Sequence, residues 1–140
     1  MAEQNNTPVL SVNSGVMNID VNDNGEVIGQ IRFNPADFDI IKRYESVVDA
    51  INNYDISENP TDEEMFKFTD TVKELTDKLL GYPVSDVLFG RTNPCTPNGQ
   101  GEFFFENVWN GLKVLIETTM NQRVGKKLKK IKAATAKYHK

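Results

Sequence analysis

Apolar and polar residues alternate over residues 17–33, which is the pattern of β-strands rather than of a helix. Every second residue from Met17 to Val21 is apolar, and the alternation resumes from Val27 to Phe33 with Gly29 in the series. The residues between the two runs, Asn-Asp-Asn-Gly, favour a tight turn. The pattern therefore predicts a β-hairpin.

The turn chemistry also predicts how the two strands are paired. A type I turn over residues 22–25, with Gly25 in the left-handed bulge position, pairs Val21 with Val27. The same register pairs Ile19 with Gly29 and Met17 with Ile31, and it places every apolar side chain on one face of the hairpin.

An alternative for this stretch is a calcium loop, because Asp20, Asn22, Asn24 and Gly25 have the spacing of the first EF-hand ligands. An EF-hand also needs a bidentate carboxylate at the twelfth position and a helix on each side. The twelfth position is Ile31 and the flanking residues alternate as strands do. The hairpin is the better interpretation, and no calcium site is expected.

Two segments with helical spacing follow the hairpin. Asn34 as N-cap and Pro35 at the first helical position predict a helix that runs to about Asn53. Thr61 and Glu64 have capping-box spacing and start a second helix of about twenty residues, which ends at Gly81. Its apolar stripe follows steps of three and four residues: Met65, Phe68, Val72, Leu75 and Leu79.

The second helix carries six carboxylates, which we interpret as surface charges rather than as acid and base catalysts. Those of the first turn, Asp62, Glu63 and Glu64, complement the helix dipole. Farther along, Lys73 with Asp77 and Glu74 with Lys78 are spaced as i,i+4 ion pairs.

The C-terminal third begins with residues 84–90, VSDVLFG, which predict a short helical plug for the core. A Gly- and Pro-rich loop of about a dozen residues follows, and its length favours a mobile or functional segment. A further helix starts near Phe103, with an apolar surface wide enough to be buried by the core or by another chain. For a partner-binding face we select Phe104, Phe105, Trp109 and Leu112, with the loop around Cys95 as a moving flap.

These elements predict an α+β fold, mostly α-helical, in which an N-terminal hairpin packs on three main helices and a short plug. Residues 1–14 form a loose arm with at most a short strand at Val9–Val12, and residues 15–122 form the single domain. Residues 123–140 form a flexible basic tail whose apolar stripe is interrupted early by Gly125.

Charge divides the chain in two. The net charge of −4 combines residues 1–122, with eight basic and twenty acidic side chains, and a tail with eight basic side chains and no acidic one. A basic amphipathic segment of this kind suits an acidic groove, a membrane surface or a nucleic acid, or else is a solvated tail. Its basic residues are Arg123, Lys126, Lys127, Lys129, Lys130, Lys132, Lys137 and Lys140.

Residue types that carry catalysis or bind metals are scarce. Cys95 is the single cysteine and His139 the single histidine, at the end of the basic tail, so neither a cysteine nucleophile with its base nor a zinc site is expected. Neither a signal peptide nor a membrane span is apparent. We therefore expect a cytoplasmic, non-enzymatic protein without a cofactor.

Two motifs give the chain a family resemblance. Arg43-Tyr44-Glu45 in the first helix, and Asp86 to Gly90 (DVLFG) before a loop and an aromatic-led last helix, resemble the small tail assembly chaperones of long-tailed phages and prophages of Gram-positive bacteria. The resemblance spans about residues 15–122. The loop sequence NPCTPNGQG departs from it.

The resemblance implies a protein that binds the tape-measure protein, keeps it soluble, helps to recruit tail-tube protein and leaves before the virion matures. Self-association would suit this role, because many modest contacts can cover a long client. The paired lysines at 126–127 and 129–130 suggest a frameshift site, which sequencing the gene for a slippery heptamer would test. Two alternatives remain: a structural tail or head-tail joining protein, and a nucleic-acid factor acting through the basic tail.

Overall fold

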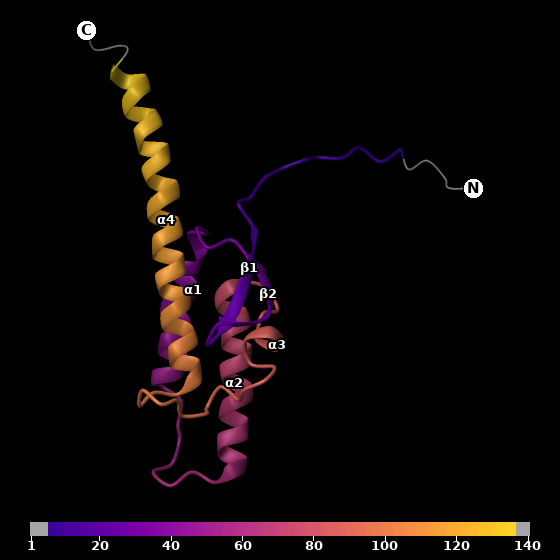
Figure 1. Ribbon diagram of the computed structural model, residues 1–140, viewed down its shortest axis with the longest axis vertical. Coiled ribbons are helices and arrows are strands. Elements are labelled where there is room, and N and C mark those ends of the chain that lie inside the picture. The colour runs from indigo at the N-terminus through magenta and orange to yellow at the C-terminus, as the bar shows by residue number, and fades with distance from the viewer. Residues whose placement is uncertain (1–5, 137–140) are drawn as a thin grey trace.

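The computed structural model describes residues 6–136, and the side chains of residues 6–127. A two-stranded antiparallel hairpin, β1 (Met17–Asp23) and β2 (Glu26–Phe33), precedes α1 (Asp39–Asn52), α2 (Asp62–Leu80), α3 (Ser85–Leu88) and α4 (Phe104–Ala136). The hairpin lies beside α2 and α3, and one end of α4 projects well beyond the other elements (Figure 1). The mostly helical α+β fold is confirmed.

Each of these elements contributes side chains to one core. Phe33 of β2, Val47 of α1 and Val72 of α2 have no exposed surface. Leu88 and Phe89 close one side, which confirms the predicted plug, and α4 adds Phe105, Leu112 and Ile116. Such burial from segments far apart in sequence is the main stabilising contribution to a domain of this size.

The hairpin is confirmed, but the predicted register is wrong by two residues. Val21 pairs with Gly29 rather than with Val27, and Ile19 pairs with Ile31. The turn has two residues, Asn24 and Gly25, both with positive φ, which fits a type I′ turn. Its tighter geometry places Glu26 opposite Asp23, and a bulge follows as Asn22 pairs with Val27.

The bulge changes which side chains of β2 face inward. Val27 is 57% exposed, whereas Ile28 is half-buried. Alternation resumes at Gly29, which lies against α3: a Cβ there would lie 2.8 Å from Val87 Cγ1. The close approach of α3 therefore explains why this strand position is a glycine.

Helix α1 begins at Asp39, so the prediction that Asn34 caps it and Pro35 opens it is wrong. Residues 34–37 form a separate turn in which the Asp37 N–H donates to the Asn34 carbonyl. The side chain of Asp37 accepts from the Asp39 N–H at 3.0 Å, so the residue that helps to satisfy the helix start lies three positions farther along than predicted.

Helix α2 begins and ends as predicted. Thr61 accepts from the Glu64 N–H, and Gly81 ends the helix in the left-handed conformation. Its ion pairing differs, since the i,i+4 pair present is Lys67 with Glu63 at 3.8 Å. Asp77, predicted to pair with Lys73, instead accepts from the backbone N–H groups of Val84 and Ser85, each at 2.8 Å.

The two ends of the described chain differ in form. Residues 6–16 belong to neither a strand nor a helix, so the short strand considered at Val9–Val12 is absent. At the other end, α4 continues across the predicted boundary at residue 122 and through Gly125 to Ala136. Residues 1–5 and 137–140, including Lys137, His139 and Lys140, lie outside the described residues.

Candidate interaction surfaces

The four residues selected for partner binding divide between core and core edge. Phe105 and Leu112 are each 5% exposed and belong to the core of the chain itself. Phe104 and Trp109 are half-buried and pack against that core. The structure thus places all four on α4 against the core, but the two that keep part of their surface lie on different sides of the helix, Phe104 towards the hairpin and Trp109 towards α1.

Trp109 links α4 to α2 by a hydrogen bond as well as by packing. Its indole Nε1 donates to Thr76 Oγ1 at 2.9 Å, and Thr76 in turn donates to the Val72 carbonyl. The indole also meets the Phe105 ring edge to face, with centroids 5.3 Å apart. Both polar groups of this contact are satisfied, so Trp109 has a structural role whatever else it binds.

We treat two adjoining hollows between α1 and α4 as the upper and lower parts of one groove. Its upper part has a volume of about 310 Å³ and is lined mainly by Ile40, Ile41, Tyr44, Ile116 and Met120. Tyr44 also lines the adjoining lower part, of about 220 Å³, whose walls include Val48, Ile51 and Trp109. These two parts share Tyr44 and together form what we call the α1/α4 groove.

The Arg43-Tyr44-Glu45 motif contributes to this groove and to the packing behind it. Arg43 donates from Nε to the Leu79 carbonyl at 2.9 Å and forms an ion pair with Asp37 at 3.3 Å. It thereby satisfies a carbonyl in the last turn of α2. Tyr44 and Glu45 line the groove, so one motif fixes α1 on α2 and forms part of a surface.

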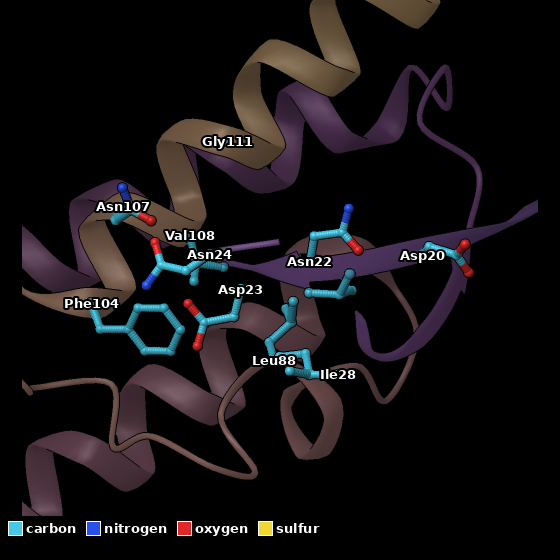
Figure 2. A pocket seen from close by; sticks show the side chains of 11 residues that line it. Asp20, Asn22, Asp23, Asn24, Ile28, Leu88, Phe104, Asn107, Val108 and Gly111 are labelled. Carbon is cyan, nitrogen blue, oxygen red and sulfur yellow. The ribbon is translucent and has the colours of Figure 1, made fainter. Parts of the chain in front are cut away.

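A second hollow, of about 410 Å³, lies between the hairpin and the start of α4. Its apolar wall includes Ile28, Leu88 and Phe104, which places one predicted partner residue beside the hairpin. Asp23, Asn24 and Asn107 gather near Phe104, while Asp20 lies apart toward the other end (Figure 2). Asp20 accepts from Gln30 Nε2 at 2.7 Å, as a cross-strand partner does.

Hydrogen bonds join the loop around Cys95 to α2 and to the start of α4. Asn93 accepts from Thr69 of α2 and from the Cys95 N–H, while the N–H groups of Phe104 and Phe105 donate back to Thr96 and Pro94. Cys95 is half-buried, and this burial raises the pKa of its thiol, partly offset by a hydrogen bond with Thr69. A raised pKa lowers the thiolate fraction, as for a passive structural cysteine.

The basic residues do not form one uniform tail. Arg123 donates to Asn34 Oδ1 at 2.7 Å and its guanidinium contacts Met17 Sδ at 3.6 Å, so it belongs to the domain. Lys126 and Lys127 are exposed on the projecting part of α4. Lys129, Lys130 and Lys132 continue the same helix, beyond the last described side chain.

Several exposed apolar residues were missed by the sequence reasoning. Phe38 is 67% exposed, Phe66 63%, Val114 63% and Ile41 55%. Phe66 lies outside the apolar stripe of α2, which was the available signal for its exposure. For Ile41 no such signal existed, because its helical spacing from Val48 and Ile51 predicts that it belongs to the apolar stripe of the first helix. In the structure it lies at the edge of the groove between α1 and α4.

Comparison with other proteins adds no assignment: no family model, curated protein or solved structure matches the chain. Within residues 6–136, no helix has the length and apolar content to cross a membrane. Among the side chains described, His, Cys, Asp and Glu nowhere gather in a group of three that could hold a metal ion.

Proposed function

We propose that this chain is a non-enzymatic phage tail assembly chaperone. It binds the tape-measure protein in the host cytoplasm, keeps it soluble, helps to recruit tail-tube subunits and is absent from the mature virion. The observation that carries the proposal is the exposure of large apolar side chains on a strongly acidic body, above all Phe38 and Phe66.

Phe38 precedes α1 and Phe66 lies in the second turn of α2, and each exposes about two thirds of its surface. Exposed aromatic residues are frequent anchors of protein interfaces because they bury much area with few rotatable bonds. Carboxylates lie close to them along the chain, since Asp39 directly follows Phe38 and Glu63 comes three residues before Phe66 in α2. Apolar contacts within an acidic surface suit weak, reversible binding of an apolar client while the complex stays soluble.

The test is co-expression of the chain with the neighbouring long open reading frame, followed by affinity purification. The proposal expects a long, helix-rich polypeptide that is soluble with the chain and aggregates without it. The double variant Phe38→Ser, Phe66→Ser should lose most of this solubilisation. The control Lys42→Ser, Asp70→Ser changes two exposed residues near the same sites and leaves the net charge unaltered. Equal loss in both variants, or no soluble client with the natural chain, would contradict the proposal.

The same preparation separates the alternatives. A structural tail or joining protein would be found by mass spectrometry in mature particles, where the chaperone should be missing. A nucleic-acid factor would copurify with DNA or RNA in a manner that falls steeply with salt and vanishes on removal of residues 123–140. The observation that favours a nucleic-acid factor as the second candidate is the exposure of Lys126 and Lys127 on the projecting part of α4.

A further inference from the structure

The three most exposed of the large apolar side chains in the described chain lie in the segment before the hairpin. Val9 is 86% exposed, Leu10 87% and Val12 79%. From Pro8 to Val12 no described hydrogen bond joins the chain to the body, and the apolar side chains are mostly exposed to solvent. Within the predicted loose segment 1–14, we call residues 8–12 alone the arm from here on. An extended apolar segment of this kind is suited to pairing with another surface.

The root of the arm is fixed by hydrogen bonds, although no described hydrogen bond holds the arm itself. Asn34 Nδ2 donates to the Ser14 carbonyl at 2.7 Å, and Arg123 in turn donates to Asn34 Oδ1. Gly15 has φ +89°, and a Cβ there would lie 2.6 Å from Arg123 Nη1, so the turn at the root requires glycine. Groups from three distant parts of the chain therefore set the direction in which the arm leaves.

That direction leads away from the chain's own α1/α4 groove. The arm departs on the hairpin side of the molecule, whereas α1 and α4 lie on the other side (Figure 1). Reaching its own groove would require the arm to reverse at the root, where Asn34 and Arg123 hold it. The same groove on another copy needs no such reversal.

The α1/α4 groove matches the arm in length, and its upper part also matches the arm in apolar character. From Ile41 to Ile51 α1 spans about 15 Å, and five extended residues span about 17 Å. Alternate side chains of an extended segment point to one side, which places Leu10 and Val12 together. The upper groove offers Ile41, Ile116 and Met120 to receive them.

Charge favours the arm over other segments of a second copy. Residues 4–19 contain no charged side chain, although a quarter of the whole chain is charged. Two bodies that each carry a charge of about −12 over residues 1–122 repel one another, and an uncharged arm meets the groove without adding to that repulsion.

We propose that the arm of one copy binds in the α1/α4 groove of a second copy, with Leu10 and Val12 inserted against Ile41, Ile116 and Met120. Because donor and acceptor surfaces differ, the contact either closes as a reciprocal pair or a ring, or builds an open row of subunits. This self-association does not depend on the proposed client.

Cross-linking between two chains of different mass tests the contact directly. Both chains carry Cys95→Ser, one carries Leu10→Cys and a larger tagged one carries Ile41→Cys, and a short bifunctional maleimide joins thiols that lie close together. The proposal expects a mixed cross-linked pair. The control replaces Ile41→Cys by Val27→Cys, at a position of nearly equal exposure on the hairpin. Equal yield from the two positions overturns the proposal.

A single chain that carries both Leu10→Cys and Ile41→Cys distinguishes a second copy from the arm's own groove. At low protein concentration the proposal expects little internal cross-link, with a yield between chains that rises with concentration. A concentration-independent internal cross-link would show the arm folding back on its own body, and would overturn the proposal.

Sedimentation of the natural chain provides the second measurement. We expect concentration-dependent self-association that weakens about tenfold or more on removing residues 2–12 or on Ile41→Asp. Val114→Asp, which adds the same charge at an exposed site on α4, should retain it. A natural chain that stays monomeric at all concentrations overturns the self-association whether or not a client binds, and a client that fails to copurify leaves it intact.

Discussion

At the scale of single residues, two short polar side chains connect segments far apart in sequence. Asn34 contacts Ser14, Ala36 and Arg123 through one amide. Asp77 accepts the N–H groups of Val84 and Ser85 and the Ser85 hydroxyl, all within 2.9 Å. Ser85 is buried, so the groups that Asp77 satisfies have little access to water.

Replacing Asp77 by alanine should therefore destabilise the fold more than a surface substitution does. Two N–H groups at the start of α3 lose their acceptor, which costs about 1–3 kcal/mol in the free energy of unfolding. Urea denaturation followed by circular dichroism measures the change, with Asp70→Ala, an exposed aspartate of the same helix, as control. Equal midpoints for the two variants would show that water replaces Asp77.

Cys95 provides a prediction about reactivity. Because burial raises the pKa of its thiol, a smaller fraction is thiolate at a given pH than in an unfolded chain. Ellman's reagent at pH 8 should thus react more slowly with the native protein than with the protein in urea. The reaction rate of the native protein should level off at a higher pH than the rate of the unfolded protein does. A native rate equal to or above the unfolded one would mean that the thiol is activated.

At the scale of elements, sequence patterns were reliable where the signals were local. Helix α2 was predictable from end to end because Thr61, its stripe and Gly81 all lie within one segment. The start of α1 was not, since Asn34, a good N-cap by residue type, is engaged by Ser14 and Arg123 instead. Of the candidate surfaces, the sequence indicated an apolar α4, but it gave no sign of the groove with α1.

The hairpin register was also mispredicted where a distant segment, α3, packs on the strand, and this contact yields a prediction. From sequence alone, the turn residues are interpreted as a type I turn over residues 22–25, whereas the observed register has a two-residue turn at Asn24 and Gly25 and goes with the packing of α3 on β2. Gly29→Ala should destabilise by about 1–3 kcal/mol, because the new methyl group would overlap Val87 and the backbone there has φ +156°. In a Val87→Ala background the same substitution should cost at least about 0.5 kcal/mol less.

The measurement is a double-mutant cycle by urea denaturation of the four proteins. The coupling isolates the overlap with Val87 from the backbone cost, since the backbone cost is common to both backgrounds. Gly25→Ala reports the cost of a positive φ alone, because a Cβ added at Gly25 would meet no other group within 4 Å. Additive costs at Gly29 and Val87 would mean that α3 does not constrain the strand.

At the scale of the whole molecule, charge and contacts divide α4 at different places. The charge changes sign after residue 122, but the last described hydrogen bonds with the body are those of Arg123 with Asn34 and Met17. Beyond them the helix projects from the body (Figure 1). The domain therefore extends at least to Arg123, and the exposed lysines that follow can contact a partner without altering the core.

Two truncations that end five residues apart test where the domain ends. A chain that stops at Lys127 keeps every described contact of Arg123 and should unfold at nearly the same urea concentration as the full chain. A chain that stops at Gln122 loses the donors to Asn34 and the fixed root of the arm, so we expect a loss of about 1–2 kcal/mol. Arg123→Ala in the full chain separates this contact from the effect of removing lysines. If the chain ending at Lys127 is already as unstable as the one ending at Gln122, the projecting part of α4 stabilises the domain and cannot be only a surface for partners.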